Sequence, residues 1–395
     1  MLHTVAFTPR AWVGAALAAA SALVFGLATW RGASSAEPDY APHAGWAQQL
    51  AETGRIAPPH PLFHLLTAAV HALLPVPSYL AAAVIVGTAA QVGLALVLYR
   101  LILAEPEQER ATAHEPWAAA GWALALMLLG PISVFTWPRH QLYLGYIVPN
   151  VFHNPTVTLL KPLAVAWFWS VTLPRQDSRR SWLLAGVLTL AATLAKPSFT
   201  VAFLPALALW LVASRRLPRA VDGGAALASL AVGAAVLACQ AWVRGSQPAL
   251  LGFAPFEVMS YYSPAWQMPF LLLCSIAFPL CVGLGRRREL RSHGPLLLAW
   301  LVFAIAAAYG YLLAEAEPNT GDGNWLWSGQ VALFVLLAQT VLLFRSRADP
   351  LARRAARAQR LGWMVLVLHL ACGLAWYAAE VVEPHEWWFP FSESE

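Results

Sequence analysis

Long apolar stretches recur along the whole chain, and short polar segments separate them. A helix needs about 20 apolar residues to cross the hydrocarbon core of a bilayer, which is about 30 Å thick. The pattern therefore predicts an all-α polytopic membrane protein with about 11 transmembrane helices. The expected spans are residues 11–30, 78–104, 117–136, 155–173, 182–195, 199–213, 222–242, 269–285, 295–313, 325–344 and 362–380.

Composition supports the same class of protein. Hydrophobic residues make up 59% of the chain and charged residues 11%, against about 25% charged residues in ordinary globular proteins. A soluble enzyme, a disordered chain and a nucleic-acid-binding protein are therefore excluded. We expect one integral membrane domain over residues 1–395, with a catalytic module at 1–242 that includes a first outside loop at 31–77, and C-terminal helices at 243–395.

The expected spans 182–195 and 199–213 are short and meet at Lys196-Pro197-Ser198. Backbone can break at membrane depth only where protein or a cavity covers it. We therefore expect these two spans to form a tight pair, bent or partly re-entrant.

Basic residues are concentrated on one set of loops. Arginines cluster at 175–180, 215–219, 286–291 and 345–360, whereas the loops of the other side hold few basic residues. The positive-inside rule places the arginine-rich side in the cytoplasm. The expected protein is a multi-pass protein of a bacterial cytoplasmic (inner) membrane, with residues 11–30 as an uncleaved first span, a cytoplasmic N-terminus and an extracytoplasmic C-terminus.

The first outside loop predicts two further helices. Pro42 and Gly54 are typical of the start and end of a helix, and residues between them form a weakly apolar stripe that suits the membrane interface. A second helix is expected within residues 58–75, bounded by prolines and too short to span. The predicted order of elements around this loop is therefore a span, an acidic residue, two juxtamembrane helices and the next span.

This arrangement resembles the C-type glycosyltransferase superfamily, whose members use polyprenyl-phosphate-linked sugars on the outer face of a membrane. The matching residues are Asp39, the helix around 44–54 and the His60-Pro-Leu-Phe-His64 segment, and the resemblance covers residues 8–215. Glu37-Pro38-Asp39 departs from a clean acidic pair, and we expect no large soluble C-terminal domain within residues 1–395. The resemblance implies transfer of a sugar from a polyprenyl phosphate to a cell-envelope acceptor.

Such a transfer needs a base to deprotonate the acceptor. Asp39 is the candidate, with Glu37 as the second choice. The alternative is that Asp39 is a solvated loop acid or a helix cap.

A second group of polar residues joins two spans outside and is expected to bind the donor phosphate. It consists of Arg139, His140, His153, Asn154 and Lys161. Arg139 and His140 are suitable donors to a phosphate. Asn154-Pro155-Thr156 predicts a capped helix start, where free N–H groups and a positive dipole favour an anion.

Only two of the 25 basic residues are lysines, Lys161 and Lys196, and each precedes a proline. Ionisable residues at membrane depth are usually paired or functional, so Lys196 joins the expected donor-phosphate ligands. The alternative is that both lysines reach the surface with no ligand to bind.

Residues expected to bind the acceptor or the sugar are His43, His60, His64, Tyr143, Glu257 and Asp322. His60 and His64 stand four residues apart, which places them on one face of a helix. With Asp39 they could bind a divalent metal, so a metal cofactor is left open and no other cofactor is expected.

Two other functions remain as alternatives. A transporter or flippase for a lipid-linked or anionic substrate would explain ionisable residues and broken spans, although its charges should lie near the midplane. A polysaccharide polymerase or ligase is chemically close. The expected partners are a polyprenyl-phosphate-linked sugar, membrane lipid and a glycan, lipid or protein acceptor, with no nucleic acid.

Overall fold

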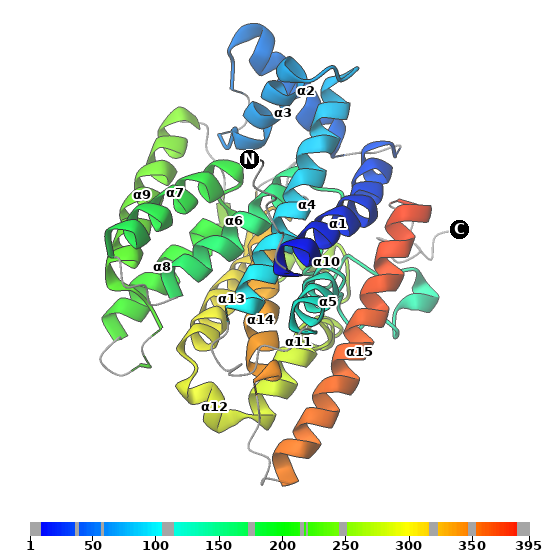
Figure 1. Cartoon of the computed structure of the whole chain (residues 1–395), viewed down its shortest axis with the longest axis vertical. Helices are drawn as coiled ribbons and strands as arrows, with labels where there is room; N and C mark the ends of the chain where they lie inside the picture. Colours follow the sequence, from blue (N-terminus) through cyan, green and yellow to red (C-terminus); the bar gives the residue numbers. More distant parts are fainter. Residues whose placement is uncertain are drawn as a thin grey trace, which may run out of the picture.

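The computed structural model describes residues 9–35, 39–56, 59–104, 114–172, 178–213, 217–218, 220–244, 251–315, 323–346 and 353–384. They form a helical bundle in which α2 and α3 lie at one end and α12 and the first turns of α15 at the other (Figure 1). The helices are α1 (Pro9–Ala33), α2 (Tyr40–Thr53), α3 (Leu62–Leu73), α4 (Tyr79–Leu103), α5 (Glu115–Met127), α6 (Pro155–Thr172), α7 (Ser178–Ala195), α8 (Ser198–Ala213), α9 (Gly223–Arg244), α10 (Glu257–Ser260), α11 (Met268–Gly285), α12 (Arg287–Ser292), α13 (Gly294–Leu312), α14 (Leu326–Arg345) and α15 (Arg353–Val382), with the short 3-10 helix η1 (Trp137–Arg139).

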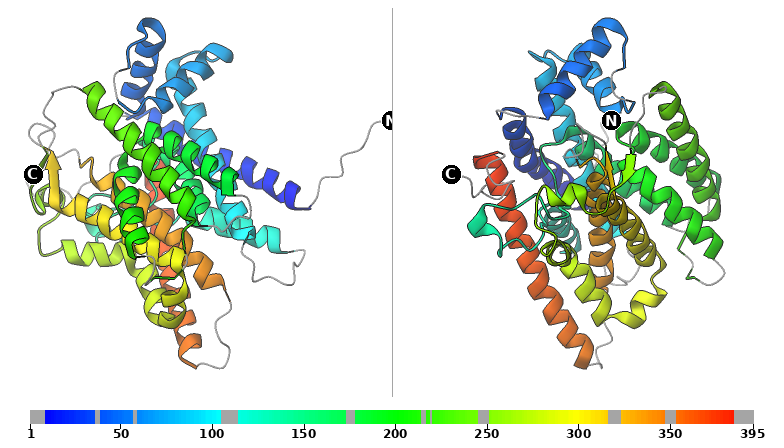
Figure 2. Two further views of the ribbon diagram at one scale, coloured as in Figure 1. Left: turned by 90° about the vertical axis from the view of Figure 1, so that its left-hand side faces the viewer. Right: turned by 180° about the vertical axis from the view of Figure 1, so that it is seen from behind.

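Each expected span overlaps a helix, but the expected number of about 11 crossings is not confirmed. Seven helices in the described part of the chain are long and apolar enough to cross a membrane: α1, α4, α9, α11, α13, α14 and α15. Helix α14 forms the centre of the bundle, since all its residues from Ser328 to Phe344 are buried. Figure 2 shows the other helices arranged around it.

The expected span 117–136 is too long, because α5 already ends at Met127. Gly130-Pro131 follows, and the residue before a proline is disfavoured in a helix. A Cβ on Gly130 would lie 2.8 Å from the Cα of Gly373 in α15, so only glycine permits this close approach.

Residues 128–154 then run as a mostly buried irregular segment that leads to the start of α6. Neighbouring helices satisfy its backbone. The Gly130 N–H donates to the His369 carbonyl of α15 at 3.0 Å, and the Ile132 N–H donates to the Cys274 carbonyl of α11 at 3.0 Å. Irregular backbone is tolerated inside a membrane protein where protein supplies such partners.

The two helices expected in the first outside loop are present as α2 and α3, which pack on each other and on α4. The side chain of Tyr40, the first residue of α2, is fully buried and packs against α1, α4 and the ring of Phe63. This packing anchors the start of α2. A Cβ on Gly87 of α4 would lie 2.5 Å from the Tyr40 hydroxyl oxygen, so glycine makes room for this ring.

The expectation that His60 and His64 share a helix face is wrong. Helix α3 begins at Leu62, and its first hydrogen bond runs from the Leu65 N–H to the Pro61 carbonyl at 2.9 Å. His60 stands between Pro59 and Pro61, two residues before the first residue of α3. Pro61 disfavours a helical backbone at His60, because the residue before a proline is restricted to extended conformations.

Helices α7 and α8 meet at residues 196–197 as the sequence predicts. The hydroxyls of Thr193 and Thr200 share a hydrogen bond of 2.9 Å across the bend, and Gln240 of α9 donates to the Thr193 carbonyl at 3.2 Å. Two short strands were not expected: β1 (Leu251–Phe253) pairs antiparallel with β2 (Leu313–Glu315).

Candidate functional site

Asp39 stands directly before α2 but does not cap it. It occupies the N-cap position, yet its side chain makes no hydrogen bond to the first turn of α2. Instead, its Oδ2 accepts a hydrogen bond of 3.1 Å from Nδ2 of Asn154, which is 115 residues away in sequence. The side chain is half-buried. The carboxylate is therefore directed into the molecule, toward the start of α6.

Asn154 caps α6, and Pro155 is the first helical residue, as the sequence indicates. Oδ1 of Asn154 accepts hydrogen bonds from the Val157 N–H at 3.0 Å and from the Thr156 hydroxyl at 2.9 Å. The N-terminal end of α6, with its partial positive charge, therefore lies beside the Asp39 carboxylate.

Lys196 lies at the bend between α7 and α8, and only 9% of it is exposed. Its ammonium stands 4.7 Å from the centre of the Trp327 ring at the start of α14, a cation–π geometry. Burial lowers the pKa of Lys196 to about 8, and the carboxylates of Asp39 and Glu315 oppose that shift. The Lys196 ammonium and the Asp39 carboxylate are therefore close enough for their charges to interact.

The C-terminal helices complete this region. Glu380 of α15 is buried and contacts His153, with 3.4 Å between its Oε2 and the histidine Nδ1. The ring of His153 packs edge-on against Tyr143 and Trp327. We call Asp39, His153, Asn154, Lys196, Trp327 and Glu380 the Asp39 site.

Tyr143 lies close enough to both carboxylates of the Asp39 site for their charges to affect it. Its ring stacks on Trp376 of α15, and its hydroxyl accepts a hydrogen bond of 3.2 Å from Gln330 of α14. Burial raises the pKa of Tyr143, and the charges of Asp39 and Glu380 raise it further.

The end of α15, which carries Glu380, is held by α1. Arg31 at the end of α1 donates hydrogen bonds to the Val381 and Val382 carbonyls at 2.6 and 2.9 Å.

His43 of α2 and His64 of α3 form a separate pair beside the Asp39 site. Their Nδ1 and Nε2 atoms share a hydrogen bond of 2.8 Å, and their rings stack with centroids 5.1 Å apart. Burial lowers the pKa of both histidines, and the charges of His64, Lys196 and His60 lower that of His43 further. The pair is therefore uncharged in the folded protein at neutral pH.

Lys161 is buried more completely than Lys196, with 1% of it exposed. Its ammonium donates to Oδ1 of Asn150 at 3.2 Å and stands 5.2 Å from the centre of the Phe334 ring. Asn150 in turn donates to the Leu126 and Leu129 carbonyls at 2.9 and 2.8 Å. Lys161 therefore contacts the buried segment that precedes α6.

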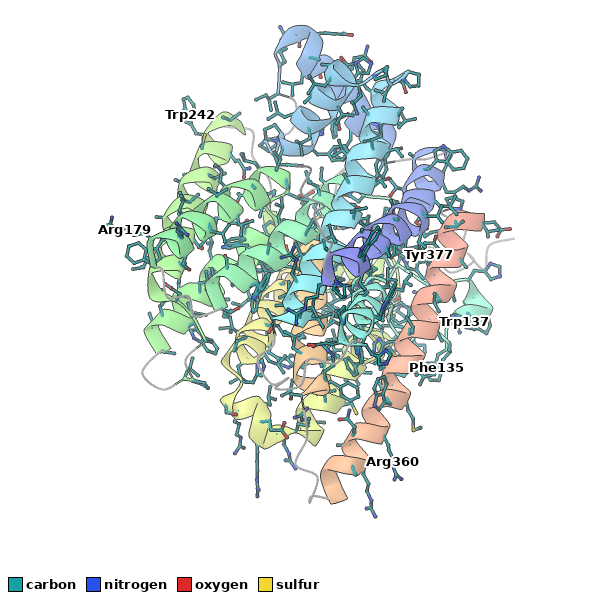
Figure 3. All side chains as sticks on the ribbon, in the orientation of Figure 1. Phe135, Trp137, Arg179, Trp242, Arg360 and Tyr377 are labelled. Atoms are coloured by element: carbon teal, nitrogen blue, oxygen red, sulfur yellow. The ribbon has the colours of Figure 1, made fainter. Side chains whose placement is uncertain are left out.

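Arg139 and Glu257 are exposed on η1 and α10, and His140 is half-buried beside η1. Figure 3 shows Trp137, the first residue of η1, at the edge of the molecule beyond α15. His60 is half-buried and close enough to His43 to influence its charge. The expected residues Glu37 and Asp322 lie outside the described residues. Within the described ranges, no group of three or more histidine, cysteine or acidic residues could hold a metal ion.

Sequence reasoning missed Trp327, Gln330 and Glu380. A signal existed for Glu380, because it is an acidic residue at the end of the apolar run 362–380, and ionisable residues in such runs are often functional. Trp327 and Gln330 had no such signal, because the apolar run that contains them is typical of any buried helix.

The fold of the chain is similar to that of a solved structure, which supports the fold expected from the sequence. No family model matches the chain, and neither does any curated protein. Among solved structures, the chain is similar to that of ArnT from Cupriavidus metallidurans bound to undecaprenyl phosphate. The TM-score is 0.53 at 13% sequence identity, over 93% of this chain and 76% of the ArnT chain.

Proposed function

We propose that this protein is a membrane glycosyltransferase that moves a sugar from a polyprenyl-phosphate donor to an extracytoplasmic cell-envelope acceptor. Asp39 acts as the base, and Lys196 holds the donor phosphate. The similar ArnT structure contains undecaprenyl phosphate, which supports a lipid of that class as the donor carrier. The proposal includes an inner-membrane location with the N-terminus in the cytoplasm and the C-terminus outside.

The observation that carries the proposal is the direction of the Asp39 side chain. An N-cap aspartate normally accepts from the N–H groups of its own helix. Asp39 does not, and its carboxylate faces Asn154 while Lys196 lies near enough to interact with it. A base and a cation on neighbouring elements are what a sugar transfer from a phosphate requires.

The reaction follows from these two charges. Asp39 accepts the proton of the acceptor hydroxyl as the acceptor oxygen forms a bond to the anomeric carbon of the sugar. The bond between that carbon and the donor phosphate oxygen breaks, and its electron pair leaves with the polyprenyl phosphate. The Lys196 ammonium stabilises the negative charge that develops on the phosphate.

A direct test replaces Asp39 by Asn, which keeps the shape of the side chain and removes the base. The purified protein in lipid nanodiscs is supplied with radiolabelled undecaprenyl-phosphate hexoses and pentoses and with an envelope extract as acceptor. We expect Asp39→Asn to release undecaprenyl phosphate at least about 100-fold more slowly than the wild type, because general base catalysis contributes roughly 100- to 10,000-fold. Wild-type turnover by a folded Asp39→Asn protein would contradict the assignment.

Glu52 of α2 supplies the matched control, because it is an exposed carboxylate on the same helix that accepts a hydrogen bond of 2.7 Å from Gln48. Glu52→Gln should transfer sugar at the wild-type rate. An equal loss in both variants would mean that the charge of the loop matters rather than the base.

A transporter or flippase remains the alternative from another class of protein. Its ionisable residues should lie near the middle of the spans, whereas Asp39, Lys196 and Glu380 come from the ends or junctions of helices. Transport of an undecaprenyl-phosphate sugar across proteoliposomes without release of undecaprenyl phosphate would favour this alternative. A polymerase or ligase would use the same site with a glycan acceptor.

A further inference from the structure

The orientation of the Asn154 amide is fixed by its neighbours. The nitrogen and oxygen of an amide side chain are assigned from the groups that they contact. The Val157 N–H can only donate, so the atom that it contacts at 3.0 Å must be the amide oxygen. The amide nitrogen then has to point the other way, where it lies 3.1 Å from Oδ2 of Asp39.

This geometry distinguishes the two oxygens of Asp39. An amide nitrogen can only donate, so Oδ2 is engaged as an acceptor by Asn154. In the described part of the chain, no second hydrogen bond to the carboxylate is present. Oδ1 is therefore the oxygen that remains for the proton of a substrate hydroxyl.

We propose that Asn154 is a positioning residue that orients Asp39 so that Oδ1 is its reactive oxygen. This inference rests on the proposed role of Asp39 as the base. Asn154 thereby links two functions in one side chain: its oxygen caps α6, and its nitrogen holds the carboxylate. A residue that only capped α6 would not need the amide nitrogen.

Two substitutions separate these functions, because Asp and Ser cap helices about as well as Asn. Asn154→Ser keeps an oxygen for the Val157 N–H and removes the donor to Asp39. Asn154→Asp keeps the cap and turns a second carboxylate toward Asp39. Neither substitution should change the melting temperature of the protein in nanodiscs by more than a few degrees.

The expected readout is the release of undecaprenyl phosphate from the undecaprenyl-phosphate sugar that the wild type uses, measured against pH. Asn154→Ser should lower kcat about 10-fold with an unchanged KM for the donor, because the base is less well oriented. Asn154→Asp should move the acidic limb of the pH–rate profile to higher pH by about one unit or more, because two facing carboxylates resist a second negative charge.

A swapped double variant, Asp39→Asn with Asn154→Asp, gives a stricter control. It restores an amide facing a carboxylate, but the carboxylate now belongs to α6. We expect the swap to keep a melting temperature close to that of the wild type and not to restore the sugar transfer. Restored transfer would show that a carboxylate on either side of the contact suffices, and it would overturn the inference.

Failure of this inference is distinguishable from failure of the proposed function. If Asp39→Asn is inactive while both Asn154 variants show wild-type kcat and an unmoved pH profile, the positioning role is overturned and the base remains. If Asp39→Asn itself is active, the proposed function is overturned, and the inference with it. If the Asn154 variants lose melting temperature but keep the wild-type rate per folded molecule, Asn154 is a cap alone and the inference is overturned.

Discussion

The surroundings of the two lysines differ sharply, although each lysine precedes a proline near the outer end of a predicted span. Lys196 lies at the bend between α7 and α8, faces Trp327 and interacts with the charge of Asp39. Lys161 lies within α6, where its ammonium donates a hydrogen bond to Asn150 and stands over the ring of Phe334. We propose that Lys196 contacts the ligand and that Lys161 supports the segment that leads to Asn154.

The difference shows that the partners around a buried ionic group indicate its role better than its exposed fraction does. Both lysines are largely buried, so each would be costly without compensation. The charges of Asp39 and Glu315 and the ring of Trp327 favour the charged form of Lys196, and an incoming phosphate would favour it further. The compensation for Lys161 is a side chain that is itself bonded to the Leu126 and Leu129 carbonyls. We therefore assign the two lysines different roles.

The largest expected effect is that of Lys196→Ala on donor binding. A hydrogen bond to a charged group contributes roughly 1.5–3 kcal/mol, so we expect the Kd for undecaprenyl phosphate to rise about 10- to 100-fold. Titration of the protein in nanodiscs with undecaprenyl phosphate measures this change. Lys196→Arg keeps the charge and should retain most of the affinity. An unchanged Kd for Lys196→Ala would contradict the assignment of different roles to the two lysines.

Lys161→Met should produce the opposite result. Met fills a similar volume without a charge, so the ligand site should keep its affinity for undecaprenyl phosphate. Removing the ammonium leaves the buried Oδ1 of Asn150 without its donor, which costs roughly 1–3 kcal/mol, and the melting temperature should fall accordingly. Weaker binding of undecaprenyl phosphate at an unchanged melting temperature would instead make Lys161 a phosphate ligand.

The smallest expected effect concerns the pH dependence of stability. The pKa values of His43 and His64 are lowered in the folded protein, so the unfolded chain takes up protons first as the pH falls below the ordinary histidine value of about 6.5. Their contribution to stability is present above that value and is lost below it, by roughly 2 kcal/mol for one histidine between about pH 7 and pH 5. Melting curves in detergent across this range measure the loss.

His64→Leu should make that fall in melting temperature shallower, because it removes one of the two titrating groups. Lys196→Ala should also weaken the dependence slightly, since the charge of Lys196 contributes to the lowered pKa of His43. Lys161→Met should leave it unchanged. Equal slopes in the wild type and His64→Leu would show that other groups control the acid response.

Much of the fold could be predicted from the pattern of the sequence. Apolar runs identify the long helices, and Asn154-Pro155 marks the start of α6, because helix caps are local signals. The end of α5 was missed because close packing of Gly130 on Gly373 is a tertiary contact between distant residues. The start of α3 at Leu62 depends on Pro61, which disfavours a helical backbone at His60.

The Asp39 site was harder to predict than the helices. Asp39, Asn154 and Lys196 could be suggested from their residue types and positions, whereas their approach to one another depends on how α2, α6 and α7 pack. Trp327 and Glu380 enter from the C-terminal helices, and their pairing with Lys196 and His153 spans more than a hundred residues of sequence. The assignment of the catalytic module to residues 1–242 stays a prediction.

The central claim is that one site, formed by Asp39 and Lys196, binds the donor and performs the transfer. A structure of the protein in nanodiscs with undecaprenyl phosphate tests it most directly. We predict a phosphate oxygen about 3 Å from the Lys196 ammonium, a hydrogen-bonding distance, on the same side of the protein as the Asp39 carboxylate. Phosphate bound beside Arg139 on η1, with Lys196 still on the ring of Trp327 and distant from the ligand, would contradict the account.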